Sequence, residues 1–169
     1  MPQFSQRLGL DYEALRLSGA QEIAAVCAQM GAQARLELLL CDPLLEPALY
    51  DQVPFLQAVR QLALNRPTLC VLVLVFDPKT ITQRGHRLVD LAQHLSSRIA
   101  IQRVADEDQE RPDAFLVVDG LGYVRRQQAE RMLAVADYGD RLMARRLIAE
   151  FTQLWERSTP DAELRRLFI

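Results

Sequence analysis

Eight consecutive apolar residues, Leu69 to Phe76, constrain the fold of this chain more than any other feature. The run is rich in β-branched valine and lies between two proline-containing segments, Asn65-Arg66-Pro67 and Asp77-Pro78. These properties predict a strand. Because the run contains no polar residue that could face water, we expect this strand to be central in a sheet and covered on both faces.

The segments around this strand alternate between helix and strand patterns. Apolar residues at helical spacing predict helices from Ser18 to Gly31, from Asp51 to Asn65 and from about Arg84 to Leu95. Further strands are predicted at Arg35 to Cys41 and at Arg98 to Val104. This β-α-β-α-β order implies parallel neighbouring strands joined by right-handed crossovers, with helices covering the sheet.

The second half of the chain has a different pattern. Two short strands, Ala114 to Asp119 and Tyr123 to Arg126, are separated by Gly120-Leu121-Gly122, which suits a tight antiparallel hairpin. A weaker strand is predicted at Arg131 to Val135. We therefore predict an α/β fold with a mixed, mainly parallel central sheet, helices on both faces and an antiparallel hairpin in the second half.

Chain length limits the number of domains. With 169 residues the chain has the size of one ordinary domain. Residues 1–17 have a mixed composition and are expected to be loosely ordered, so residues 18–169 are expected to form a single domain. Its principal packing element should be a long helix that Asp137 or Asp140 caps and that Ser158-Thr159-Pro160 ends.

Composition and charge exclude several classes of protein. Half the residues are apolar, a quarter are charged and the formal net charge is -2, which argues against a disordered chain and makes a nucleic-acid partner unexpected. Nearly all basic residues are arginine, a bias typical of a GC-rich genome. The start of the chain lacks an export signal and no apolar run could span a membrane, so we expect a cytoplasmic protein without a membrane partner. Three widely separated cysteines, Cys27, Cys41 and Cys70, indicate reduced core residues.

The loop after the central strand, Asp77 to His86, is the first candidate for a site, because ligands of α/β sheets bind beyond the carboxyl ends of strands. Asp77, Lys79, Arg84 and His86 gather there beside a predicted helix start, where backbone N–H groups favour an anion. The alternative is a turn at Asp77-Pro78 followed by solvated side chains.

Other clusters of polar residues do not predict a metal or a cofactor. His86, Asp90 and His94 are spaced along one helix face, but one ion could not reach all three, and a zinc site needs a further ligand. The acidic run from Asp106 to Asp113 lacks the glycine-centred spacing of a calcium loop and reads as an exposed loop. No nucleophile elbow, phosphate loop or dinucleotide fingerprint is present. We expect no cofactor and no metal.

The apolar segment Ala114 to Gly120, which ends in Asp119-Gly120, resembles the strand that carries the HxKxxxxD signature of the phospholipase D superfamily. The preceding helices and buried strands and the closing helix with Phe151-Thr-Gln-Leu-Trp155 resemble one phospholipase D-like module, over roughly residues 20 to 157. The resemblance implies a phospholipase D-like fold.

The resemblance puts Asp119 at the aspartate position, Pro112 at the histidine position and Ala114 at the lysine position. In the family the histidine attacks phosphorus to form a covalent intermediate, and the lysine binds the phosphate. Proline offers no nucleophile and alanine offers no cation. Active members also combine two such motifs, from two halves of a chain or from a homodimer. The resemblance therefore implies a non-catalytic relative, a pseudoenzyme that lacks the catalytic histidine and lysine.

Three hypotheses about function follow. The first is a phospholipase D-like pseudoenzyme that acts as a protein-interaction or dimerisation module. Its partner would be a second copy of the chain or another protein. The chain is also similar to uncharacterised bacterial domains that sometimes accompany acetyltransferase domains, which suggests an acetyltransferase as that other protein. The second is a binding module for a small phosphorylated or anionic ligand that uses Lys79, Arg84 and His86, with Asp77 and Asp119 as further candidate site residues. The third is an enzyme of different chemistry, which no nucleophile-base spacing supports.

Overall fold

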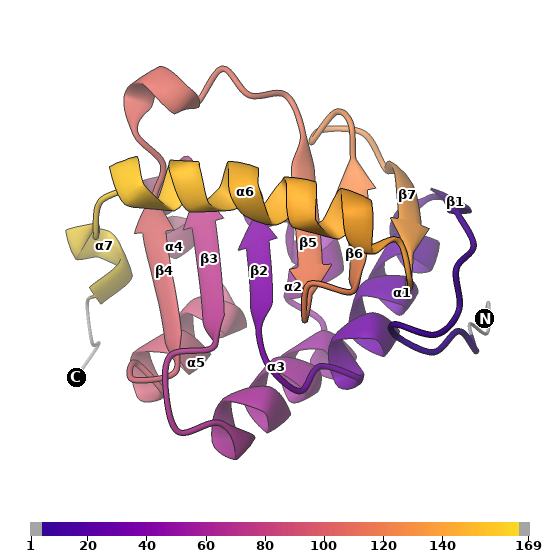
Figure 1. Cartoon of the computed structure of the whole chain (residues 1–169). Coiled ribbons are helices and arrows are strands. Elements are labelled where there is room, and N and C mark those ends of the chain that lie inside the picture. The colour runs from indigo at the N-terminus through magenta and orange to yellow at the C-terminus, as the bar shows by residue number, and fades with distance from the viewer. Residues whose placement is uncertain (1–4, 166–169) are drawn as a thin grey trace.

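A seven-stranded sheet forms the centre of the computed structural model, which describes residues 5–165 (Figure 1). Its strands lie in the order β1-β7-β6-β5-β2-β3-β4. β2, β3 and β4 are parallel, and the four other neighbouring pairs are antiparallel. The strands are β1 (Leu15–Ser18), β2 (Leu38–Cys41), β3 (Val71–Val75), β4 (Ile99–Arg103), β5 (Ala114–Val118), β6 (Gly122–Arg126) and β7 (Leu133–Asp137).

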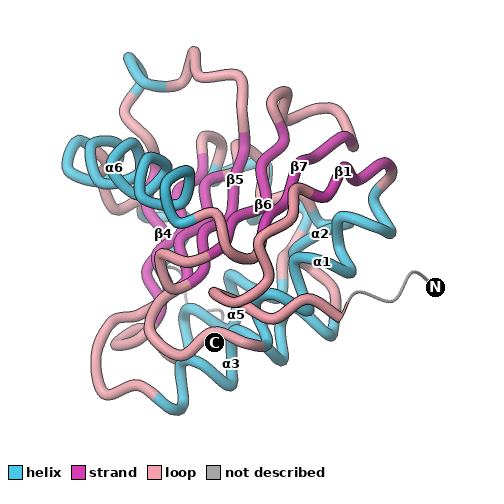
Figure 2. Tube along the Cα trace, turned by 45° about the vertical axis from the view of Figure 1, so that its right-hand side comes forward, coloured by secondary structure: helices cyan, strands magenta, loops and turns pink. Residues whose placement is uncertain are grey.

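Helices cover both faces of the sheet (Figures 1 and 2). On one face pack α1, α3 and α5, and α6 crosses the other face alone. In β2, Leu38 and Leu40 belong to the core under α1 and α3, whereas Leu39 and Cys41 belong to the core under α6, so the strand is apolar on both sides. The helices are α1 (Ala20–Ala32), α2 (Pro47–Tyr50), α3 (Val53–Asn65), α4 (Pro78–Arg84), α5 (Arg87–His94), the 3₁₀ turn Asp106–Asp108, α6 (Arg141–Arg157) and α7 (Ala162–Arg165).

The predicted mixed α/β fold with helices on both faces is confirmed, and so is the antiparallel hairpin of β5 and β6. Parallel pairing, however, is limited to β2, β3 and β4, so the expectation of a mainly parallel sheet holds only for that part. The reason is the connection from β4 to β5. Residues 104–113 contain no crossover helix and stay at the edge where β4 ends, so β5 runs back antiparallel beside β2 (Figure 1).

Residues 1–17 were expected to be loosely ordered, but the part of this segment that the structure describes is ordered. Its described part, residues 5–17, packs on the domain and contributes most of β1, which pairs with β7. The backbone N–H of Gly9 donates to Tyr138 O at 2.6 Å, and that of Leu8 donates to the Gln33 carboxamide at 2.8 Å. Sheet pairing therefore begins before residue 18. The predicted N-terminal segment and domain also include residues 1–4 and 166–169, which lie outside the described residues.

The segment after the central strand also differs from the prediction. Residues 78–84 form α4, and α5 begins at Arg87 rather than at about Arg84. Gly85 separates the two helices with a φ of 77°, which glycine adopts readily. Asp77 caps α4 and His86 caps α5 through their side chains.

Two further features bear on function. Cys27, Cys41 and Cys70 are free and buried, as predicted, and burial raises the pKa of Cys27 to about 12, so this thiol stays protonated. Within residues 5–165, no helix has the length and apolar character needed to cross a bilayer.

Candidate functional site

His86 does not join Lys79 and Arg84 in an anion site. Its ring is buried, Nε2 donates to Leu45 O at 2.8 Å, and Nδ1 accepts from the backbone N–H of Leu88 at 3.1 Å. Burial, above all, lowers the pKa of His86, which favours the neutral ring that these two bonds require. Both ring nitrogens are therefore engaged in holding the start of α5.

The other residues of this loop are arranged as a helix start rather than as a binding site. Oδ1 of Asp77 accepts from the backbone N–H of Thr80 at 3.1 Å, and Oδ2 accepts from the Thr80 hydroxyl at 2.7 Å. The hydrogen bonds from Thr80 lower the pKa of Asp77. Lys79 and Arg84 are exposed, and five residues along a helix place them on different sides of α4. The structure does not bring the predicted cations together.

Asp119 and this loop lie at opposite ends of the strands. β5 runs antiparallel to β2, so its end lies beside the start of β2, whereas Asp77 follows the end of β3. The Asp119 carboxylate accepts three backbone N–H bonds, from Arg35 at 2.8 Å, Leu36 at 2.8 Å and Glu37 at 3.0 Å. Asp119 holds the entry to β2, and the predicted site residues do not line one cleft.

The sequence did not predict a buried ion pair, which lies at the end of the sheet where strands β2 and β6 terminate. Arg126 Nη1 donates to Asp42 Oδ2 at 3.0 Å, and both residues are 2% exposed. Arg126 Nη2 also donates to Ala129 O at 2.5 Å, while its Nε has no partner. Burial raises the pKa of Asp42, and the Arg126 charge opposes that rise. The pair faces the α1 side, and only the Asp42-Pro43 turn was visible in the sequence.

A second cluster lies at the same end of the sheet on the α6 side, at the start of β5. The buried Asp113 carboxylate is bracketed by Arg111 Nε at 2.5 Å and Arg125 Nε at 2.9 Å. Arg111 also contacts Glu150 of α6 at 3.2 Å and lies over the Phe115 ring at 5.1 Å from its centroid. These ion pairs tie the start of β5 to β6 and α6.

The two positions that the resemblance assigned to catalysis, Pro112 and Ala114, flank Asp113 of the second cluster in the sequence. Pro112 is exposed, and its carbonyl accepts from the backbone N–H of Ala129 at 2.8 Å. Ala114 is 1% exposed at the start of β5. Its methyl group is enclosed in the core and presents no functional group to the edge.

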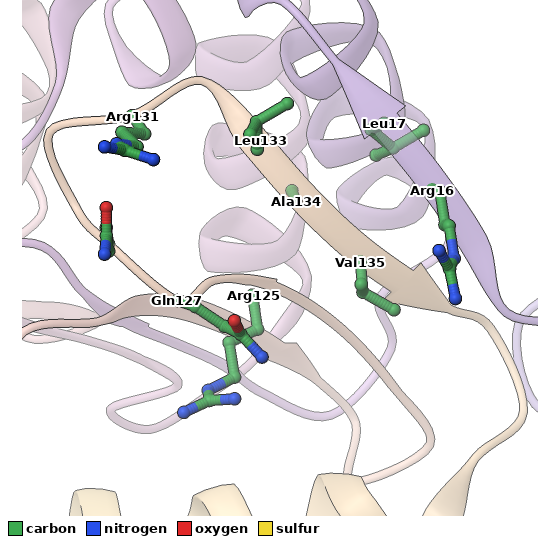
Figure 3. A pocket seen from close by; sticks show the side chains of 9 residues that line it. Arg16, Leu17, Arg125, Gln127, Arg131, Leu133, Ala134 and Val135 are labelled. Carbon is green, nitrogen blue, oxygen red and sulfur yellow. The ribbon is translucent and has the colours of Figure 1, made fainter.

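A pocket of about 540 Å³ lies beside this end of the sheet. It is on the same face of the sheet as α6, over strands β6, β7 and β1 (Figure 3). Three arginines line it, Arg16, Arg125 and Arg131, together with Gln127 and Gln128. Its apolar part includes Leu133 and Val135. Alternation along β1, β6 and β7 could have placed these side chains on one face, but only the strand order brings the three strands together.

The described residues offer no metal centre. His94 makes a short-range bond between Nδ1 and Asp90 O at 2.7 Å, and within residues 5–165 no three histidine, cysteine or acidic side chains converge. The acidic run after β4 forms a 3₁₀ turn in which Asp106 contacts Arg103 and Asp108 contacts Arg157.

Solved structures share this fold. Nuc from Salmonella typhimurium, a phospholipase D family member, is 10% identical, with a TM-score of 0.62 over 87% of this chain and 96% of that chain. NucT from Helicobacter pylori is 5% identical, with a TM-score of 0.65 over 89% of this chain and 100% of that chain. TrmBL2, an archaeal chromatin protein whose structure shows a mode of DNA binding, is 13% identical, with a TM-score of 0.64. The match covers 90% of this chain but only 55% of TrmBL2.

These likenesses define the chain as a mixed α/β domain with a phospholipase D-like fold. Residues 19–167 match the family described as Domain of unknown function (DUF7931), so the chain belongs to that family. No curated protein matches the chain.

Proposed function

We propose that this chain is a non-catalytic phospholipase D-like domain, a pseudoenzyme, that acts as a protein-interaction or dimerisation module. One observation carries the proposal: the positions that would hold the nucleophile and the phosphate-binding cation are Pro112 and a buried Ala114. The chain has two histidines, His86 and His94, and both belong to α5 or its cap rather than to the edge at β5. A covalent phosphohistidine step therefore has no residue to form it there.

The purified chain is expected to hydrolyse bis(p-nitrophenyl) phosphate no faster than buffer, because neither of its two histidines lies beside the start of β5. Release of p-nitrophenol is the measurement, with an active phospholipase D-family nuclease as the positive control. Hydrolysis that follows the protein across a size-exclusion peak and is lost in His94→Gln would contradict the non-catalytic assignment. Hydrolysis that survives His94→Gln but is lost in His86→Gln would contradict it equally.

The surface best suited to a second copy of the chain is the groove between α1 and α3, of about 900 Å³. None of its thirteen lining residues is charged, although a quarter of all residues in the chain are. Five are glutamines, and a carboxamide both donates and accepts, so the same patch can pair with its own copy across a two-fold axis. The lining residues are Ala20, Gln21, Ala24, Ala25, Ala28, Gln29, Ala32, Ala48, Gln52, Pro54, Gln57, Ala58 and Gln61.

The double variant Gln57→Glu/Gln61→Glu is expected to weaken the dimer at least about tenfold, because it places like charges opposite each other across the two-fold axis. Both residues are exposed on α3 and glutamate suits a helix, so the fold is retained. Light scattering coupled to size exclusion, at about 100 µM and below, measures the assembly. Gln153→Glu, an exposed position of α6, is the matched control and should leave the dimer unchanged.

Wild-type chain that is monomeric at about 100 µM would overturn the homodimer without affecting the non-catalytic assignment. The interaction proposal would then rest on a different protein. An acetyltransferase domain, suggested by the resemblance, would be the first partner to mix with the wild-type and Gln57→Glu/Gln61→Glu chains.

A further inference from the structure

The pocket on the α6 face of β6, β7 and β1 has the arrangement of an anion site. Arg16 of β1 and Arg125 of β6 both pair with Val135 of β7, so the three residues form one row across three strands. Neighbouring strands lie about 5 Å apart, which separates the two arginine Cα atoms by about 10 Å. Arg131 approaches from the loop before β7 (Figure 3).

The charge of these arginines is largely uncompensated. No carboxylate lines the pocket. Arg16 and Arg131 are exposed, and within residues 5–165 neither makes an ion pair. Arg125 is held differently, because its Nε donates to the buried Asp113. This bond fixes the direction of the guanidinium and leaves its Nη groups for another acceptor, so part of the site is oriented before any ligand arrives.

The floor between the arginines is apolar. Leu133 is 56% exposed although it belongs to a strand in the sheet, and Val135 lies two residues further along the same face. Gln127 and Gln128 add carboxamide donors at the rim. Figure 3 shows the aliphatic side chains lying between the guanidinium groups. Guanidinium groups around an aliphatic floor suit a ligand that is apolar in the middle and anionic at its ends.

We propose that this pocket binds a small molecule that carries at least two oxyanion groups, carboxylates or phosphates, on a compact apolar frame. Arg16 and Arg131 bind the oxyanions, Arg125 is preset by Asp113 to bind one of them, and Leu133 and Val135 contact the frame. The site differs from the predicted Asp77 to His86 loop and involves none of the positions 112, 114 and 119. It also lies on the opposite face of the sheet from the α1-α3 groove, so it stands or fails independently of the dimer.

Isothermal titration of the wild-type chain tests the ligand class. The probes are isophthalate, which has two carboxylates on a ring, resorcinol bisphosphate, which has two phosphates on a similar ring, and sulfate, which has no frame. At least one of the two ring compounds is expected to bind about tenfold or more tightly than sulfate, and to weaken as salt rises from about 50 to 200 mM. The ring that binds more tightly distinguishes carboxylate from phosphate ligands.

Variants locate the binding. Arg16→Gln and Arg131→Gln are each expected to weaken binding of the tighter ring compound about tenfold, because a charge-assisted bond is lost. Both positions are exposed, so thermal stability without ligand should not change. Arg60→Gln, on α3 across the sheet, is the matched control and should bind as wild type.

Three results would overturn the proposal. The first is no binding heat from either ring compound at about 1 mM. The second is binding that is unchanged in both Arg16→Gln and Arg131→Gln, or equally weakened in Arg60→Gln. The third is a single-stranded oligonucleotide that binds about tenfold more tightly than either ring, which would make the pocket part of a nucleic-acid surface instead.

Discussion

Arg126→Met should lower the free energy of unfolding by about 3–5 kcal/mol, because it leaves the Asp42 carboxylate buried without its cation. The Met side chain fills a similar volume, so the loss reports the unpaired charge rather than a cavity. Urea unfolding followed by circular dichroism gives the free energy. Arg145→Met, an exposed residue of α6, is the matched control and should stay within about 0.5 kcal/mol of wild type.

Replacing both partners should restore most of that stability. In Asp42→Leu/Arg126→Met no buried charge remains, and the Nε of Arg126, which has no partner in the native fold, no longer has to be desolvated. The Ala129 carbonyl loses its donor, so a deficit of about 1 kcal/mol should persist. A double variant as unstable as the sum of the single variants would show that Asp42 and Arg126 act independently, and would contradict the account of an unpaired buried charge.

The deficit of Arg126→Met should shrink as the pH falls. Burial already raises the pKa of Asp42 in the folded chain, and removal of the cation that opposes this rise raises it further. A carboxyl whose pKa is higher in the folded than in the unfolded state binds its proton more tightly when folded, so protonation stabilises the fold. Unfolding measured from pH about 7 down to about 4 should bring the variant closer to wild type. A deficit that grows with acidity would contradict the assignment.

Asp119→Ala is expected to cost about 2–4 kcal/mol, the second largest effect. The substitution removes the acceptor of three backbone N–H groups, from Arg35, Leu36 and Glu37. It also leaves alanine at a φ of 57°, which asparagine and aspartate tolerate better. Urea unfolding measures the loss, and faster amide hydrogen exchange at residues 35–37 locates it.

Asp119→Asn tests the cause of this loss. The carboxamide retains one acceptor oxygen and suits the left-handed conformation, so its cost should be about half that of alanine or less. Glu156→Ala, an exposed acidic position on α6, controls for loss of a negative charge and should change stability by about 0.5 kcal/mol or less. Equal losses in Asp119→Ala and Glu156→Ala would contradict a capping role.

The structural role of Asp119 bears on the resemblance to the phospholipase D signature. Of the three positions in that pattern, this chain retains the aspartate, whose carboxylate here holds the entry to β2. The two positions that differ, Pro112 and Ala114, are those to which the resemblance assigns chemistry. The bonds from residues 35–37 give the Asp119 carboxylate a structural role that does not depend on catalysis.

Local sequence patterns determined much of the fold. The apolar run at Leu69 to Phe76 became β3, the glycine-rich turn after Asp119 became the β5-β6 hairpin, and helical spacing located α1, α3 and α6. These features depend on residues close in sequence, where periodicity and turn chemistry act directly. The resemblance to phospholipase D modules, drawn from the order of these elements, is confirmed at the level of the fold.

Tertiary structure decided the rest, because it depends on which distant strands become neighbours. Asp42 and Arg126 are 84 residues apart in sequence, and no local pattern predicts that β2 and β6 end at the same edge. The same holds for Asp119, which turns toward Arg35 only because β5 runs antiparallel to β2. His86 was predicted to bind an anion, but its ring is hydrogen-bonded to the carbonyl of Leu45, which is 41 residues away in the sequence. Arg16 and Arg125 line a common pocket because both pair with Val135 of β7, which lies between them.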